Sequence, residues 1–379
     1  MSGLRLAGAL AALVAAGFGL ALLTAHPPPR PLKPLARPAL EMAETFTKIA
    51  IGSCADQNFP EPIWDTIRAE HPELFIFMGD NVYGDVSGND PAMPELKTAY
   101  DKLGHIWSFR RFQRETPVLP IWDDHDYGRN DAGAEFPLKA QAKALFLQFW
   151  GIPKEVARYS RPGLYDALII GPSGHRIQII LLDLRWFRDA WTPSDQKDAP
   201  GKQRYIPNPD PSKTLLGSAQ WAWLEGELKK EAELRLIVSS IQVEADGHGF
   251  ERWGNFPVER QRLYDLIAKT QAGGVVFLSG DRHAGGLYRK EEGMPYPLFE
   301  ITSSALNRPS QVQDQPEPDR LGDLYTKENY GLLTIDWRLR TLRLELKDLK
   351  GETVMAASAP LAALKPAPPR PNFVRDEPH

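Results

Sequence analysis

Short apolar runs recur along the chain, and each is bounded by polar, glycine or proline residues. The clearest cover residues 48–51, 74–78, 118–121, 177–182, 234–238 and 275–278, and further candidates cover 298–302, 331–335 and 341–346. Runs this short are typical of strands, and the uniformly apolar ones predict strands buried on both faces. Between them, apolar side chains recur at helical spacing over residues 138–149, 221–228 and 263–267. Strands that alternate with helices predict an α/β fold.

Polar side chains that can bind metals directly follow four of these runs. The four stretches are residues 52–54, 79–83, 122–126 and 279–283. Because each stretch follows a predicted strand, the four can meet at one point although they are far apart in the sequence. They supply sulfur, carboxylate, phenol and imidazole groups, which suit metal ions, and metal ions at strand ends suit hydrolysis.

A separate physical argument makes each of these residues a candidate metal ligand. A carboxylate at a strand end, such as Asp80, can bridge two cations because each of its oxygens can serve one metal. Tyr83 can return to the same ion across a turn, and a phenolate ligand indicates a ferric ion. Asp281 and His283 would point to the same side of an extended stretch. A lone cysteine is more often a small buried hydrophobic residue, and only its place at a strand end makes Cys54 a candidate.

Three aspartates crowd around His125, at positions 123, 124 and 126. Like charges this close make a poor structural motif unless a cation neutralises them. The neighbouring carboxylates also favour the protonated imidazole. His125 is therefore expected to be either a metal ligand or a general acid.

The composition excludes some classes of protein. The 379 residues allow one large domain or two ordinary ones. A formal net charge of −4 without a basic block argues against a nucleic-acid-binding surface. Cys54 is the only cysteine, so no intramolecular disulfide is possible and the cysteine content says nothing about the compartment.

An apolar stretch near the N-terminus predicts export. Residues 6–25 contain no charged side chain and follow Arg5. Residues 1–25 therefore predict a cleaved signal peptide or an uncleaved membrane anchor, and either would carry the rest of the chain to the periplasm or cell exterior. We expect a Pro-rich linker over residues 26–46, a catalytic domain over 47–358 and a Pro-rich tail over 359–379.

Taken together, the four stretches resemble the motifs of the calcineurin-like metallophosphoesterases. That superfamily usually carries Asp-x-His, Gly-Asp-x-x-Asp, Gly-Asn-His-(Glu/Asp) and Gly-His-x-His in this order. This chain differs at each motif, with Cys54 in place of the first, Tyr83 for the second Asp, Asp124 for Asn and Asp281 for the first His. These departures resemble the alkaline phosphatase D (PhoD-like) branch, and the similarity runs from about residue 49 to about residue 306.

The resemblance implies a four-layer αββα metallophosphatase sandwich. It also implies hydrolysis of phosphate monoesters or diesters by a metal-bound hydroxide. By matched position, the implied metal ligands are Cys54, Asp80, Tyr83, Asp124, Asp281 and His283. The implied metals are Fe³⁺ and Ca²⁺, with a Mn²⁺ or Zn²⁺ pair as the alternative. His125 would be the acid near the leaving group.

Two arginines are candidate clamps for the phosphate, because a guanidinium group matches two phosphate oxygens. Arg282 lies between two of the predicted ligands. Arg185 follows the apolar run at 177–182, and for this residue a structural pair with Asp183 is an equally good interpretation.

Several long predicted loops are candidate lids over the site, namely residues 84–99, 189–214, 244–258 and 305–328. His248 and Trp253 lie in one of these loops and can form a wall of the substrate site. Gln242 ends another predicted strand. It is expected to contact a metal or water, or, more often for such a residue, to pack as a buried polar group.

Two other functions stay open. The first is a phospholipase-type phosphodiesterase that acts on lipid head groups, which a retained anchor at residues 6–25 would favour. The second is a non-catalytic phosphate- or metal-binding protein of the cell envelope. The combination of an acid candidate with a full ligand set argues against this second function. A small phosphoester is the expected substrate, and no protein partner is inferred.

Overall fold

The computed structural model of the protein describes residues 32–36, 38–312 and 314–366. The predicted leader at residues 1–25 and residues 367–379 of the predicted tail lie outside this part. Its strands are β1 Lys48–Gly52, β2 Leu74–Met78, β3 Val118–Ile121, β4 Asp166–Ile170, β5 Ile177–Leu181, β6 Leu234–Ser239, β7 Val275–Ser279, β8 Gly285–Lys290, β9 Leu298–Ser303, β10 Asn329–Asp336, β11 Thr341–Asp348 and β12 Thr353–Pro360. Its helices are α1 Ile63–Ala69, α2 Pro94–Leu103, α3 Trp107–Glu115, α4 Asp124–Tyr127, α5 Lys139–Phe149, α6 Ala157–Ser160, α7 Gly217–Leu228 and α8 Pro257–Thr270, with 3₁₀ turns at Trp253–Asn255 and Leu361–Leu364.

The described strands form two mixed sheets of six strands each. The first has the order β12-β11-β10-β1-β2-β3 and the second β4-β5-β6-β7-β9-β8. Strands β1, β2 and β3 run parallel to one another, as do β5, β6, β7 and β9. The antiparallel pairs are β1 with β10, β10 with β11, β11 with β12, β4 with β5, and β8 with β9. Strands β2, β5 and β7 are buried along their whole length, as their uniformly apolar runs predict.

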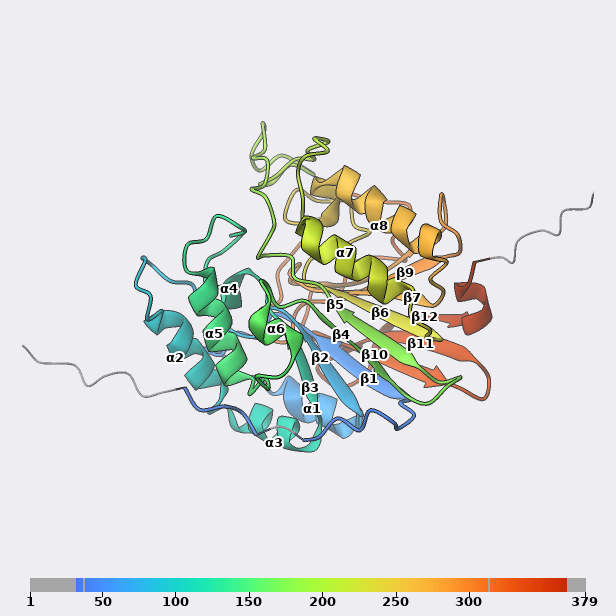
Figure 1. Ribbon diagram of the computed structural model, residues 1–379, viewed down its shortest axis with the longest axis horizontal. Helices are drawn as coiled ribbons and strands as arrows, with labels where there is room; N and C mark the ends of the chain where they lie inside the picture. The colour runs from blue at the N-terminus through green and yellow to red at the C-terminus, as the bar shows by residue number, and fades with distance from the viewer. Residues whose placement is uncertain (1–31, 37, 313, 367–379) are drawn as a thin grey trace, which may run out of the picture. The chain divides into compact units, whose positions relative to one another are not determined.

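Two hydrophobic clusters fill the spaces between four layers, and the larger cluster covers both faces of the second sheet. Because side chains alternate along a strand, Ile49 and Ile51 of β1 belong to the core between the sheets, and Ala50 belongs to the core under the first helices. Trp64 of α1 packs edge-on against Phe75 of β2 in that outer core. Helices α7 and α8 cover the second sheet on the other side (Figure 1). The arrangement is the predicted αββα sandwich.

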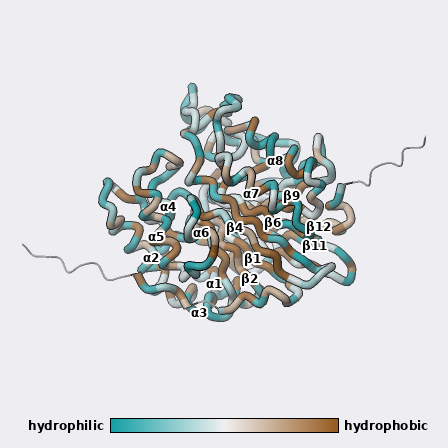
Figure 2. The backbone as a smooth tube through the Cα atoms, viewed as in Figure 1, coloured by the Kyte–Doolittle hydropathy of each residue, from teal (hydrophilic) through white to brown (hydrophobic). Residues whose placement is uncertain are grey.

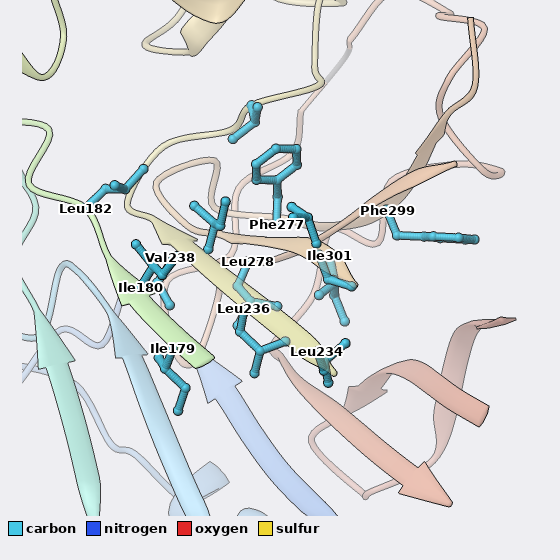
Figure 3. Packing of buried hydrophobic residues seen from close by; sticks show 14 of the residues in the cluster. Ile179, Ile180, Leu182, Leu234, Leu236, Val238, Phe277, Leu278, Phe299 and Ile301 are labelled. Carbon is cyan, nitrogen blue, oxygen red and sulfur yellow. The ribbon is translucent and has the colours of Figure 1, made fainter. Parts of the chain in front are cut away.

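The second sheet carries most of the apolar core. Figure 3 shows Ile179, Leu236, Val238 and Ile301 from neighbouring strands meeting in one layer. Colouring by hydropathy shows the same concentration of apolar residues along the central strands of both sheets (Figure 2). The sheets therefore form a rigid support, and the loops at their strand ends carry the polar groups.

The described part of the predicted linker packs on the helices instead of running free. Leu32 is buried, and the Leu35 amide donates to the carbonyl of Phe149 at the end of α5. At the other end, β12 runs to Pro360, and Leu361 and Leu364 are buried after it. The folded part thus extends beyond residue 358, because these leucines belong to the hydrophobic cluster that contains the second sheet.

No helix within the described ranges combines the length and the apolar composition that a membrane span requires.

Candidate metal centre

The side chains that follow the predicted strands converge at one place. The first sheet supplies Cys54 after β1, Asp80 after β2 and Asp124 after β3. The second sheet supplies Asp281 and His283 after β7. Their ligand atoms form groups whose members all lie within 4.8 Å of one another, and Asp80 belongs to three of the groups found among the described residues. The two sheets thus share one candidate metal centre.

One group combines sulfur, oxygen and nitrogen donors around Asp80. The Cys54 Sγ and the Tyr83 hydroxyl each lie 3.4 Å from Asp80 Oδ2. The Tyr83 hydroxyl also lies 2.9 Å from His283 Nε2. A thiol, a phenol, a carboxylate and an imidazole therefore face one point, which is the donor set predicted for this side of the centre.

The second group consists of four carboxylates. Asp80, Asp123, Asp124 and Asp281 bring one oxygen each within 4.8 Å of the others. Asp123 was not among the predicted ligands. Its Oδ1 accepts hydrogen bonds from Arg185 Nε at 2.7 Å and Ser240 Oγ at 2.5 Å. Asp80 belongs to both groups, which is what the bridging role predicted for it requires, and that role stays a prediction.

Metal ions fit these residues because the centre has too much buried negative charge without them. Asp80 Oδ1 and Asp123 Oδ2 are buried and have no hydrogen-bond partner among the described residues. Burial raises the pKa of Asp80 well above its usual value, and the neighbouring Cys54 raises it further. Burial and Asp123 do the same to the pKa of Asp281. Burial also raises the pKa of the Cys54 thiol to about 11. Cations among these groups would stabilise all of them in the charged form.

Four residues of the centre have backbone conformations that residues other than glycine rarely adopt. Cys54, Asp80, Asp281 and His283 have φ angles of 60°, 47°, 64° and 57°. The expectation of an extended stretch at 281–283 is therefore wrong, because the chain turns sharply after β7 and the Arg282 amide bonds to the Gly280 carbonyl. Left-handed backbone at non-glycine residues is costly and persists where the surroundings hold it, often at functional sites. The turn sends Asp281 to the carboxylate group and His283 to the sulfur-containing group.

His125 lies beside the carboxylates with its ring held from two sides. Its Nδ1 lies 2.6 Å from Asp85 Oδ2, and its ring centroid lies 4.3 Å from that of Tyr83. Burial alone would lower the pKa of this imidazole. Nearby carboxylates outweigh burial, Asp124 and Asp80 most strongly and then Asp85, and raise the pKa to about 11. The side chain is therefore a charged donor at the edge of the centre.

The two predicted phosphate clamps occupy different environments. Arg185 is fully buried, and its guanidinium group bonds to Asp123 and, through two nitrogens, to Glu251. Its backbone amide, rather than its side chain, bonds to Asp183. Arg282 pairs with Asp314 and lines a pocket next to the centre. Of the two, only Arg282 has a side chain on the pocket.

That pocket has a volume of about 440 Å³ and opens beside the carboxylate group. Asp124, Asp281, His125 and His283 form its inner part. Its outer wall, which is the more exposed part, comes from three of the predicted loops: residues 203–204 from one, Phe250 from the second and residues 310–312 from the third. The predicted lids thus supply most of the outer wall.

Three other residues singled out from the sequence lie away from the pocket. His248 and Trp253 are fully buried, so neither forms the expected substrate wall. Phe250 from the same loop lines the pocket instead. Gln242 is buried among polar side chains: its amide nitrogen donates to Tyr288 and Thr302, and its oxygen lies 2.9 Å from His248 Nε2. Gln242 is thus a packed polar residue.

Several residues at the centre carry no local sequence signal. Asp85, Glu251 and Arg308 reach it from loops, and Arg308 lies over the Tyr83 ring with its Cζ 5.0 Å from the centroid. None of them directly follows a predicted strand. An acidic or basic residue in a loop is common, so only the fold reveals what these side chains contact.

Known proteins share this fold. A solved structure of PhoD superposes with a TM-score of 0.66 at 17% identity and covers 86% of this chain and 70% of that one. A purple acid phosphatase, PPD1 from yellow lupin (Lupinus luteus) seeds, superposes with a TM-score of 0.57 at 11% identity, covering 85% of this chain and 55% of that one. At these identities the similarity shows the fold, which is of the metallophosphatase type.

The family follows from the sequence match. The model of the PhoD-like phosphatases matches residues 49–332, so the chain belongs to the PhoD-like phosphatase family. Alkaline phosphatase D of Bacillus subtilis (strain 168) is 26% identical over 186 residues. That match spans 44% of this chain but only 31% of the Bacillus protein.

Proposed function

We propose that the protein hydrolyses phosphate esters in a metal-dependent reaction, as a phosphodiesterase or alkaline phosphatase of the D type. The observation that carries this proposal is the meeting of six ligand-type residues from two sheets around Asp80, next to an open pocket. Membership of a phosphatase family supports it. The buried oxygens that lack partners support it too, since they are arranged for cations rather than for each other.

For the metals, we propose Fe³⁺ with Ca²⁺, and a Mn²⁺ or Zn²⁺ pair is the alternative. Thiolate and phenolate donors beside His283 suit a ferric ion, whereas the group of four carboxylates suits an ion that prefers oxygen. The residues that would hold the ions are those predicted, Cys54, Asp80, Tyr83, Asp124, Asp281 and His283, together with Asp123. When bound, such ions would offset the negative charge of the phosphate and lower the pKa of water at the site.

The remaining side chains have separate roles in this proposal. His125 donates a proton to the oxygen of the departing group. Asp85 holds its ring, and Asp124, Asp80 and Asp85 together favour its charged form. Arg282 lines the pocket and binds the non-bridging phosphate oxygens. Arg185 acts indirectly: its bonds to Asp123 and Glu251 hold the carboxylate group in position.

The reaction takes place outside the cytoplasm in this proposal. Support comes from the apolar stretch at residues 6–25, which fits a signal peptide or an uncleaved anchor. A fusion of residues 1–46 to a reporter that is active only after export would test this. A reporter that stayed inactive would contradict the proposed location and leave the proposed chemistry untouched.

The test of the function is a side-by-side assay of the purified protein with a phosphomonoester, a phosphodiester and a phospholipid. Metal content and the visible absorption spectrum are measured on the same sample. We expect turnover of at least one of the first two substrates, and an absorption band from a tyrosinate–ferric pair. A colourless active enzyme with manganese or zinc would replace the iron assignment. No turnover despite full metal occupancy would contradict the function, and turnover of the phospholipid alone would assign the lipid-directed activity.

A further inference from the structure

Arg204 is a charged residue on the outer wall of the pocket that the proposed chemistry does not use. It lies in the loop between the predicted clamp Arg185 and helix α7, and its side chain is 46% exposed. It lines the same pocket as His125, Asp281 and Arg282. Burial lowers the pKa of its guanidinium group, but Asp131 outweighs burial, with smaller contributions from Tyr205 and Asp281, so that the pKa lies above its usual value.

The loop that carries Arg204 is held firmly against its neighbour. The amides of Arg204 and Tyr205 both donate to the Gly249 carbonyl, at 2.9 and 2.7 Å, and the Gly249 amide donates to the Gln203 side chain. A Cβ atom at position 249 would lie 2.5 Å from the Gln203 nitrogen, so only glycine allows the two backbones to approach this closely. Hydrogen bonds between the two loops therefore fix the backbone of Arg204 at the wall of the pocket.

The guanidinium group of Arg204 is fixed on one side and open on the other. Its Nη1 donates to Asp131 Oδ2 at 2.8 Å, and its Cζ lies 5.5 Å from the ring centroid of Phe250. Within the described part of the chain, its side-chain hydrogen bonds run through Nη1 alone. The other N–H groups of a guanidinium fork match the oxygens of a phosphate or carboxylate. A ligand in this pocket thus finds a pre-oriented anion-binding group.

Two arginines at different depths divide the pocket into an inner and an outer part. The Cζ of Arg282 also lies over the Phe250 ring, 5.0 Å from its centroid, but its side chain is only 7% exposed and follows directly after Asp281. Arg282 therefore faces the inner part, where the scissile phosphate would bind. Arg204 lines the same pocket but is far more exposed, so it is available to a second group of a ligand whose phosphate binds in the inner part.

We propose that Arg204 selects phosphoesters whose departing part carries a second anionic group, a carboxylate or a phosphate. This inference rests on the proposed phosphoesterase function and names the substrate class of the same site. In such a substrate, one anion binds at the centre and the other pairs with Arg204. An uncharged departing group would gain nothing from Arg204.

The experiment compares two diesters that differ in one charge, methyl para-carboxyphenyl phosphate and methyl para-carbamoylphenyl phosphate. Hydrolysis of either breaks the bond between phosphorus and the aryl oxygen, forms a new phosphorus–oxygen bond from water, and releases methyl phosphate and a phenol. The ratio of kcat/KM for the charged ester to that for the neutral one is measured in the wild type and in Arg204→Gln. We expect this ratio to fall about fivefold in the variant, the effect of a partly exposed ion pair, and to fall in the wild type as salt is added.

Two control variants separate charge from folding. Arg204→Lys keeps the positive charge and should retain most of the preference. Arg289→Gln removes an exposed arginine on β8 that pairs with Glu291, and should leave the ratio unchanged. An unchanged ratio in Arg204→Gln would overturn the inference. If both esters lost activity equally, Arg204 would act on the loop or on the shared phosphate. A wild type that hydrolysed neither ester while holding metal would overturn the proposed function, and this inference with it.

Discussion

His125 and Asp80 lie in the same cluster of carboxylates, but the proposed function gives them different tasks. His125 lies at the edge of the centre, and its ring nitrogen faces Asp85. Asp80 lies at the middle and belongs to both the sulfur-containing group and the carboxylate group. Replacement of each residue should therefore give a different pattern of lost metal and lost activity.

His125→Ala should reduce kcat by about 10²- to 10⁴-fold, the usual contribution of a general acid, while the metal content stays near that of the wild type. Turnover and metal content are measured on the same preparation. His105→Ala is the matched control because that side chain is 71% exposed on the surface. Loss of metal together with activity would show that His125 is a ligand instead.

Asp80→Asn should lose metal and activity together, because the amide removes the charge that both groups share. The control is Asp101→Asn, which changes an exposed aspartate in α2 in the same way. Metal content after dialysis is the deciding measurement, with circular dichroism to confirm folding. Full metal occupancy in Asp80→Asn would contradict the bridging position.

At the scale of elements, the close packing of the two sheets can be tested at Gly331 of β10. A Cβ atom there would lie 2.5 Å from Ile51 Cγ1 and 3.1 Å from Ile301 Cδ1, so it would push against both sheets. Gly331→Ala should reduce the free energy of unfolding by about 1–3 kcal/mol, as overpacking of a core does. Urea denaturation measures the change.

The matched control lies in a helix and should act in the opposite direction. Gly226 in α7 has no atom within 4 Å of its would-be Cβ. Gly226→Ala should stabilise the protein by about 0.5–1 kcal/mol, because alanine is the better helix former. If Gly331→Ala were equally stabilising, the sheets would not be in the tight contact described.

A buried acidic pair links the loop after β6 to α8 and β9, and it predicts a pH dependence of stability. Burial and the neighbouring Glu300 raise the pKa of Glu244 to about 8, although Tyr264 donates a hydrogen bond to it. The pKa in the folded protein thus exceeds the unfolded value, so the contribution to stability is complete below about pH 4.3 and is lost as the pH rises through about 8.

Glu244→Gln should remove most of this loss, because the neutral amide resembles the protonated acid. Between pH 5 and pH 9 the wild type should lose about 2–4 kcal/mol more unfolding free energy than the variant. Urea denaturation at both pH values measures the difference. Parallel pH profiles for the two proteins would show that Glu244 is charged in the folded state at low pH.

At the scale of the whole molecule, metal removal should weaken the fold as well as abolish activity. The centre joins the strand ends of both sheets, and its buried aspartates repel one another without cations. Chelation should therefore lower Tm, by the equivalent of about 3–4 kcal/mol if the free ion had been 100 to 1,000 times above its Kd. Readdition of single metals should restore Tm to different extents and so rank them. A Tm that did not change on complete metal loss would contradict this coupling.

Most of the strand pattern was predictable because it depends on local burial, whereas helices α1, α2, α3, α4 and α6 were not predicted. The uniformly apolar runs that form β2, β5 and β7 can be recognised as buried strands from a few consecutive residues. Strands β4, β8 and β12 were not predicted. β4 is only half-buried, β8 begins with two glycines and β12 is built largely from small or exposed residues. Their strand state depends on the neighbour that each one pairs with.

The sequence by itself determined the α/β class and most of the residues that can bind metal, because ligand-type side chains directly follow apolar runs. Only the tertiary structure decided how these residues combine. Sharp turns after β7 send Asp281 and His283 to different groups. Arg185 is buried because Glu251, 66 positions away, binds its guanidinium group, whereas Arg204 reaches the pocket because its loop bonds to Gly249. These partners are distant along the chain, and side-chain direction follows from such long-range contacts.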